Sequence, residues 1–460
     1  MTLPPELLHA IAHEGGGKVV LVLGAGASFE TPTGLPLSRD CSVEANRRLV
    51  ADGVLAADAC ADPEDLSSLA DAVFAATGNQ AALVERLPIS AFRSAEPNEG
   101  YLIAACLLRE QAVTCVMTLN FDLGMSAALT QLGATDVSVV CGPDEHHRLG
   151  TLNVIYLHRN VNAPAEAWIL RTAALDTEWR DRWEQVVVQR VVGSPVTVFA
   201  GLGTPAAVLV KTATRVRNAL PDATDVYLVD PGEREQSVFF EKLALADDAY
   251  LQIGWCDFAR ALAERVLEEH RAELEQACRA LITSESWLDD DPAELCRRVA
   301  GLGLVGLGEL RARWTLDPAP YTPRRSMNTG WLADLLLAIG VLEGAADARA
   351  VFDRDGVVEL RRDDRHLASM IVASGRGTKR WLALEAEIGQ HAHRVRPREQ
   401  PPRFALVSGV VGERPAAVAP PANIATGDEE ATIIGTIGAP ELVSAEELRA
   451  TPGIALRMAA

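Results

Sequence analysis

The sequence predicts an α/β protein in which a mostly parallel sheet is covered by helices on both faces and is followed by a smaller α+β domain. An almost unbroken apolar run, KVVLVL at residues 18–23, is flanked by glycines, as in a strand buried on both faces. Similar runs alternate with helix-like segments as far as residue 280, which favours parallel strand pairing. Beyond that point, a proline-rich stretch and a hairpin-like pattern indicate a second region.

The elements of the first region follow one another in a regular order. Further strands are predicted at residues 112–119, 137–141, 153–157, 196–200 and 225–229. Helices are predicted at residues 43–55, 81–93, 101–110, 176–192, 205–219 and 257–281. Strands separated by helices in this way build a Rossmann-like sheet, and we assign it to a first domain at residues 1–280.

The second domain, at residues 281–460, is expected to serve assembly or regulation. A short amphipathic helix is predicted at Gly330–Leu342, and a hairpin at Val351–Arg361, where DRDG supplies the turn. Two strand-like runs follow at residues 401–412 and 431–438.

Basic residues are frequent between Arg361 and Arg403, where they are interspersed with acids. A solvated face is favoured there over a patch for nucleic acid or a protein partner. His146 and His147 are adjacent and therefore expected to point apart, so they are not assigned to a metal.

Composition limits the class of protein. The chain has 460 residues, of which 48% are hydrophobic and 23% charged, with a formal net charge of -20. Such an acidic balance argues against direct binding of nucleic acid or anionic membranes. Neither a secretory signal nor an apolar stretch long enough for a membrane span is expected. The eight cysteines form no C-x-x-C pair, which fits reduced thiols in the cytoplasm.

Residues able to carry chemistry follow the predicted strands, at the sheet edge where ligands of α/β proteins bind. GAGAS (Gly24–Ser28) follows the first strand, and its amides would face a pyrophosphate. TLNFD (Thr118–Asp122) follows the second, and His158 ends a later strand. FAGLGT (Phe199–Thr204) repeats the strand–glycine arrangement, and VYLVDP places Asp230 at another strand end. Each feature alone also fits a structural turn or cap, but their recurrence at five strand ends favours a site.

The set resembles the sirtuin superfamily over roughly residues 15–270. GAGAS resembles its phosphate turn, GLPLSR (Gly34–Arg39) its G-I-P-D-F-R segment, and TLNFD its T-Q-N-I-D. LH ending at His158, GLGT and VDP match further family segments in the same order. The resemblance implies that NAD+ is the substrate. The residues it assigns to the dinucleotide are Gly24, Ala25, Gly26, Ser28, Pro36, Arg39, Thr118, Gly203, Thr204 and Asp230. It makes His158 the catalytic base and places Asn120 and Asp122 at the nicotinamide–ribose pocket.

Two departures from the family alter the expected activity. Family deacylases carry two C-x-x-C pairs just after the histidine, whereas residues 159–196 contain no cysteine, so no zinc is expected. The family's Phe is Ser38 here, which would admit water to the ribosyl cation and favour hydrolysis. The family's Gly after the histidine is Arg159, whose role the sequence leaves open. The combination resembles the zinc-less NADase branch found in bacterial antiphage defence.

The favoured interpretation is an NAD+ glycohydrolase that cleaves NAD+ to nicotinamide and ADP-ribose. The resemblance implies that it acts as a defence effector that depletes NAD+. Cleavage develops a cationic ribose, which Asn120 would orient, while His158 accepts a proton. Because a free NADase is toxic, the resemblance implies gating by a homo-oligomer or by a partner such as a HerA-type ATPase or a phage-sensing protein. The alternatives are a protein deacylase or ADP-ribosyltransferase, and a non-catalytic module that binds NAD or ADP-ribose.

Overall fold

The structure is a computed structural model that describes residues 3–12, 17–176, 182–203, 206–220, 223–284, 302–307, 330–352, 357–380, 402–411 and 440–459. The chain divides into two compact units, the first ending at Val266 and the second beginning at Leu267. The predicted domain boundary at residue 280 stays a prediction. No helix in the described part of the chain is both long and apolar enough to cross a membrane.

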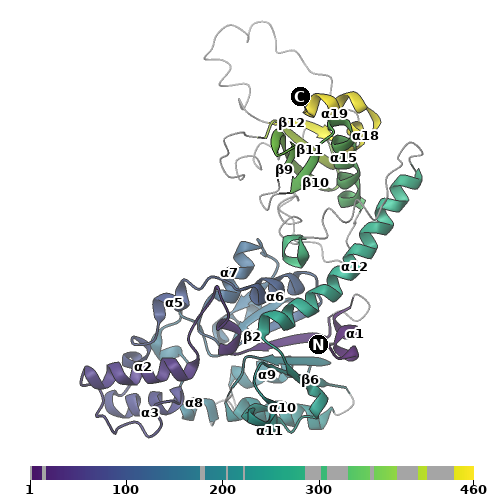
Figure 1. The fold of residues 1–460 in the computed structure, drawn as a ribbon. Coiled ribbons are helices and arrows are strands. Elements are labelled where there is room, and N and C mark those ends of the chain that lie inside the picture. Colours follow the sequence, from purple (N-terminus) through teal and green to yellow (C-terminus); the bar gives the residue numbers. More distant parts are fainter. Residues whose placement is uncertain are drawn as a thin grey trace. The chain divides into compact units, whose positions relative to one another are not determined.

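The first unit contains a seven-stranded parallel sheet in the order β3-β4-β2-β1-β5-β6-β7 (Figure 1). Its strands are β1 (Val19–Leu23), β2 (Val113–Thr118), β3 (Ser138–Val140), β4 (Asn153–Tyr156), β5 (Val196–Ala200), β6 (Asp225–Asp230) and β7 (Tyr250–Gln252). All five residues of β1 are buried, as the apolar run predicted. The predicted Rossmann-like, helix-covered parallel sheet is therefore confirmed.

Helices connect these strands and cover both faces. They are α1 (Pro5–Ile11), α2 (Ser38–Ala51), α3 (Leu66–Thr77), α4 (Ala81–Val84), α5 (Ile89–Arg93), α6 (Glu99–Arg109), α7 (Gly124–Gln131), α8 (Thr172–Asp176), α9 (Trp183–Val192), α10 (Ala207–Ala219), α11 (Val238–Leu243) and α12 (Trp255–Ser284). Short 3-10 turns include η2 (Ala25–Ser28) and η3 (Pro143–Arg148). On one face, α9 and α10 pack on Val20 and Val22 of β1.

Several predicted helix limits are wrong for identifiable reasons. The helix predicted at 43–55 begins at Ser38 and stops at Ala51, because Gly53 adopts φ +71° and the amide of Val54 bonds back to Leu49. The segment 81–93 forms two short helices, since Pro88 interrupts it. Helix α3 was not predicted, although Asp65 caps it by accepting the amides of Ser67 and Ser68.

Strand order locates the place where the connections reverse. From β1 the chain adds β2, then β3 at the edge and β4 between them on one side, and it then returns to add β5, β6 and β7 on the other. The carboxyl ends of β1 and β5, at Leu23 and Ala200, therefore flank a topological switch point, the usual ligand position in open α/β sheets.

The second unit has a five-stranded mixed sheet in the order β12-β11-β10-β9-β8 (Figure 1). Its elements are α15 (Gly330–Ala346), β8 (Arg349–Phe352), β9 (Val357–Arg362), β10 (Arg365–Arg380), β11 (Phe404–Val411), β12 (Glu441–Ser444), α18 (Ala445–Ala450) and α19 (Pro452–Ala459). The antiparallel pair β8–β9 confirms the predicted hairpin, and the mixed composition confirms the α+β class. The strand predicted at 431–438 lies outside the described residues.

Two interpretations of this region are corrected. The helix α15 is not a short amphipathic helix, because Leu335–Ile339 are buried without interruption in the core of this unit. The stretch after Arg361 is not only a solvated face. Met370, Ile371 and Val372 of β10 are buried between β9 and β11.

Candidate functional site

Polar side chains meet in the first unit where β1 and β2 end. Ser28 comes from η2 directly after β1, Asn120 and Asp122 from the loop after β2, and Tyr101 from the first turn of α6. All four are buried, with exposed fractions of 2%, 7%, 4% and 1% for Ser28, Asn120, Asp122 and Tyr101. The structure therefore brings together three residues that the sequence predicted, although Ser28 lies more than 90 positions from Asn120 and Asp122.

Asn120 is held by its side-chain amide. Its Nδ2 donates to the carbonyl oxygen of Gly24 at 2.9 Å, to Ser28 Oγ at 2.9 Å and to the Tyr101 hydroxyl at 3.1 Å. Its own backbone amide donates to Thr118 Oγ1 at 3.0 Å. Among the described residues, its Oδ1 has no hydrogen-bond partner. Asn120 therefore offers an acceptor, not a donor, to a bound molecule.

Both carboxylate oxygens of Asp122 accept a hydrogen bond. Ser28 Oγ donates to Oδ2 at 2.7 Å, and the Gly124 amide donates to Oδ1 at 2.8 Å. Burial raises the pKa of Asp122, while these two hydrogen bonds oppose the shift. The Tyr101 hydroxyl oxygen lies 2.7 Å from Ser28 Oγ. Because the hydroxyl proton of Ser28 is donated to Asp122, Tyr101 is the donor in this hydrogen bond.

Tyr101 was not predicted as a site residue. Burial and the charge of Asp122 raise its pKa well above the ordinary value, so the hydroxyl stays protonated and able to donate. Its ring lies edge-on to Trp255, with centroids 6.5 Å apart. No local signal marks it, because the sequence EGYLIAACLLR of α6 is typical of a buried helix.

The glycine turn is built by close approach of two backbones. The Gly24 amide donates to the Ala200 carbonyl and the Gly26 amide to the Gly201 carbonyl, both at 2.9 Å. A Cβ on Gly26 would lie 2.6 Å from Gly201 Cα. Gly24 and Gly26 thus permit this packing, and their N–H groups are bonded to protein carbonyls. Ala25 and Ser28 are the residues of the turn that border the cavity described next.

A cavity of about 50 Å³ lies beside the network. Its wall includes residues predicted for the site, namely Ala25, Ser28, Pro36, Asn120 and Asp122, and also Ser38. The rest is apolar and comes mainly from the segment between β1 and α6: Leu35, Cys41, Leu66, Leu87, Phe92, Leu119 and Phe121.

His158 lies in the turn after β4, the strand next to β2. The register pairs Thr118 with Tyr156, so Asn120 and His158 both lie two residues beyond this pair. The His158 side chain is 8% exposed, and burial together with the Arg159 guanidinium lowers its pKa to about 3. The imidazole is therefore neutral at physiological pH. His158 is not among the residues that line the 50 Å³ cavity.

Arg159, directly after His158, has a left-handed backbone, with φ +76°. Its guanidinium donates to the Leu157 carbonyl at 3.1 Å and to Glu184 Oε1 at 2.8 Å, and it lies 5.5 Å from the Trp183 ring. Arg159 therefore ties the end of β4 to α9.

The remaining predicted residues lie in different settings. Arg39 is exposed and paired with Glu64 at 2.5 Å. Asp230 Oδ1 accepts the Gly232 amide at 2.8 Å, as a turn cap does. Gly203 has open space around its Cβ position. Thr204 lies outside the described residues. Within the described part of the chain, no group of three or more His, Cys, Asp or Glu could hold a metal ion.

No family model matches the chain. No curated protein matches it either. Among solved structures, it is similar to a mutant Sir2 homologue in complex with ADP-ribose, with 18% identity and a TM-score of 0.34, covering 58% of this chain and 98% of that one. It is also similar to a Sir2 homolog–NAD complex, with 17% identity and a TM-score of 0.32, covering 57% of this chain and 94% of that one. A third similar structure is Sir2 bound to an acetylated peptide, with 15% identity and a TM-score of 0.32, covering 56% of this chain and 96% of that one.

Proposed function

We propose that the first unit binds NAD+ and hydrolyses its nicotinamide–ribose bond. The observation that carries this proposal is the buried network of Ser28, Tyr101, Asn120 and Asp122 at the switch point of a parallel sheet. Fixed polar groups at that edge are the usual means by which such sheets hold a nucleotide. The sirtuin-like sequence segments supply the identity of the nucleotide.

The hydrogen-bond network supports a particular role for Asn120 in the proposed reaction. Its Nδ2 is occupied by Gly24, Ser28 and Tyr101, so its Oδ1 accepts a hydrogen bond from a ribose hydroxyl or from the attacking water. Bond cleavage develops positive charge on the ribose, and an acceptor oxygen fixed in advance stabilises it without reorganisation. Asp122 and Tyr101 act as positioning residues, since their polar atoms hold Ser28 and Asn120.

His158 is the proposed base. Its imidazole is neutral at pH 7 and is therefore available to accept a proton from the ribose or from water. Because burial keeps its pKa at about 3 and makes it a weak base, we propose that this pKa rises toward neutrality when the site opens to NAD+ and water. Ser38 at the cavity wall leaves room for water where a phenyl ring would exclude it, which favours hydrolysis over transfer to another acceptor.

The cavity must enlarge to hold the substrate. Ligand sites commonly measure about 300–1,000 Å³, so a space of about 50 Å³ accepts only part of a dinucleotide. The wall formed by Leu35, Ser38, Leu66 and Phe92 belongs to the helical segment between β1 and α6. We propose that this segment moves away from the sheet edge when NAD+ binds.

A direct test incubates the purified full chain with NAD+ and follows nicotinamide and ADP-ribose by chromatography. Free nicotinamide with ADP-ribose is expected, and Asn120→Ala should abolish it while circular dichroism stays unchanged. Asn218→Ala, an exposed asparagine on α10, is the matched control and should retain activity. Full activity in Asn120→Ala contradicts the proposal. Acyl-ADP-ribose formed from an acylated peptide indicates a deacylase, and a tight unreacted complex indicates a sensor.

The cellular role is a further part of the proposal. Uncontrolled NAD+ hydrolysis would poison the cell, so the activity requires a gate, either self-association or a regulatory partner encoded nearby. Depletion of NAD+ during phage infection is the setting that fits the sequence resemblance. Infecting cells that carry the wild-type chain or Asn120→Ala and measuring NAD+ tests this role: the level should fall only with the wild type.

A further inference from the structure

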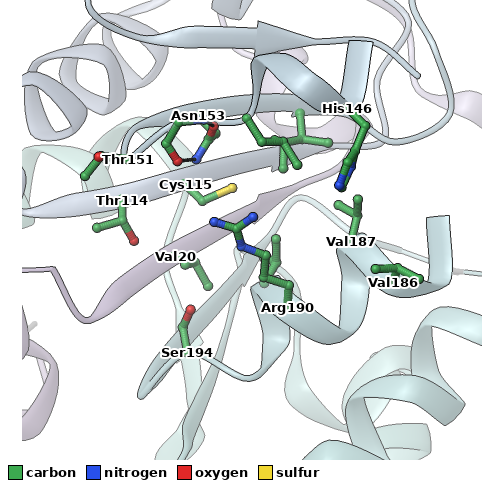
Figure 2. Close-up of a pocket in the computed structure, with 14 residues that line it drawn as sticks. Val20, Thr114, Cys115, His146, Thr151, Asn153, Val186, Val187, Arg190 and Ser194 are labelled. Atoms are coloured by element: carbon green, nitrogen blue, oxygen red, sulfur yellow. Dashed lines mark hydrogen bonds between the residues drawn. The ribbon is translucent and has the colours of Figure 1, made fainter. Parts of the chain in front are cut away.

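A second, larger cavity of about 300 Å³ lies in the first unit, between the sheet and α9 (Figure 2). It is bordered by residues at the beginnings of three neighbouring strands: Val20 of β1, Thr114 and Cys115 of β2, and Asn153 of β4. The network around Asn120 lies past the opposite ends of β1 and β2. The two places are therefore distinct, and neither the sequence segments nor the proposed hydrolysis uses the larger one.

Arg190 is the one charged side chain apart from His146 among the 14 residues that line this cavity. Figure 2 shows its guanidinium extending from α9 toward Cys115. Burial raises the pKa of the Cys115 thiol to about 12, and the nearby Arg190 charge opposes this shift. Among the described residues Arg190 has no ion pair, and it remains exposed. An unpaired guanidinium is notable in a chain with 63 acidic and 43 basic residues.

The other groups divide the cavity into a polar and an apolar part. Hydroxyls of Thr151 and Ser194 supply neutral donors near the beginnings of the strands, whereas the Thr114 hydroxyl already donates to the Val19 carbonyl at 3.4 Å. His146 accepts the Trp183 indole N–H at its Nδ1, 2.9 Å away, so its Nε2 carries the proton when the ring is neutral. The apolar wall consists of Val20, Leu149, Ile155, Val186, Val187 and Val191.

We propose that this cavity binds a small carboxylate with an apolar body. The planar guanidinium of Arg190 matches a carboxylate by paired hydrogen bonds, and the valine-rich wall of α9 takes the hydrocarbon part. No acidic residue lines the cavity to repel an anion. A single arginine balances one negative charge, which favours a carboxylate over a phosphate dianion. The volume lies at the lower end of the range for small-molecule sites.

The probes are benzoate, its neutral analogue benzamide, and inorganic phosphate, each titrated into the full chain and followed by ligand-observed NMR. Benzoate should bind, whereas benzamide and phosphate should not. Arg190→Met keeps the side-chain length without the charge and should weaken benzoate binding by roughly tenfold or more, because it removes a charge-assisted pair. Arg190→Lys should give an intermediate loss.

Arg215→Met is the matched control, an exposed arginine on α10 that does not line the cavity, and it should bind benzoate like the wild type. Equal benzoate binding by wild type and Arg190→Met overturns the proposal, as does absence of binding to the wild type. Binding of phosphate in preference to benzoate overturns the choice of carboxylate. Because none of these measurements involves NAD+, their outcome is independent of the proposed hydrolysis.

Discussion

At the scale of single residues, His158 makes the stability of the folded chain depend on pH. Burial and the Arg159 charge lower its pKa to about 3 in the folded chain, against about 6.5 when unfolded. Between these values the unfolded chain binds a proton that the folded chain does not. Stability conferred by the neutral imidazole is therefore complete above pH 6.5 and declines as the pH falls toward 3.

We expect the free energy of unfolding of the wild type to fall between pH 6.5 and 4 more steeply than that of His158→Gln. The difference in slope approaches ~1.4 kcal/mol per pH unit, the value for one proton. Urea unfolding followed by circular dichroism at several pH values measures it. Exposed His147→Gln is the control and should leave the slope unchanged. Parallel curves for wild type and His158→Gln contradict the assignment.

The sequence predicted part of the residue-level site correctly. Ser28, Asn120 and Asp122 were expected together because they follow strands of one parallel sheet, and they are joined by hydrogen bonds. Tyr101 was unforeseen, because only the packing of α6 on the sheet brings its hydroxyl to Ser28. The ion pair of the exposed Arg39 with Glu64 was also unforeseen, because it depends on a tertiary contact that no local sequence pattern specifies.

At the scale of elements, the turn after β1 and the turn after β5 depend on one another. Gly201 has φ +68°, and a Cβ there would lie 2.4 Å from the Ala27 amide nitrogen. A side chain would have to displace η2, which carries Ser28, or strain the turn itself.

Gly201→Ala is therefore expected to destabilise the first unit by about 2–4 kcal/mol, since it combines left-handed strain with a backbone clash. Gly203→Ala provides a close control, because no atom lies within 4 Å of its Cβ position. Chemical denaturation of the two variants tests the difference. Similar midpoints for both would show that the two turns do not constrain each other.

Sequence patterns predicted strands better than helices. Buried parallel strands such as β1 and β5 are continuous apolar runs, and their limits were found within a residue or two. The three-residue strand β7 was not predicted, whereas β3, which is equally short, was. In β10, the charged residues around Arg365 obscured the buried Met370–Val372, whose environment is set by β9 and β11.

At the scale of the whole molecule, each unit has its own buried core. A ligand that binds only the folded first unit should stabilise that unit by mass action and leave the other unaffected. ADP-ribose is a suitable probe because it is a product of the proposed reaction and is not consumed.

We expect ADP-ribose at 100 times its Kd to raise the melting temperature of one calorimetric transition by roughly 5–10 °C, corresponding to ~2.7 kcal/mol. The other transition should not move. Adenosine monophosphate at equal concentration is the control for non-specific nucleotide effects. Absence of any shift argues against a dinucleotide site, and equal shifts of both transitions argue against independent units.

The ion pair between Arg159 and Glu184 bears on the electrostatic cost of the proposed reaction. An isolated guanidinium next to the proposed base would repel a sugar that becomes positively charged as its leaving group departs. Glu184, buried on α9 with its carboxylate 2.8 Å from Arg159, offsets part of that positive charge. The Arg159 guanidinium still lowers the pKa of His158, so the ion pair reduces the repulsion of a carbocation without abolishing it.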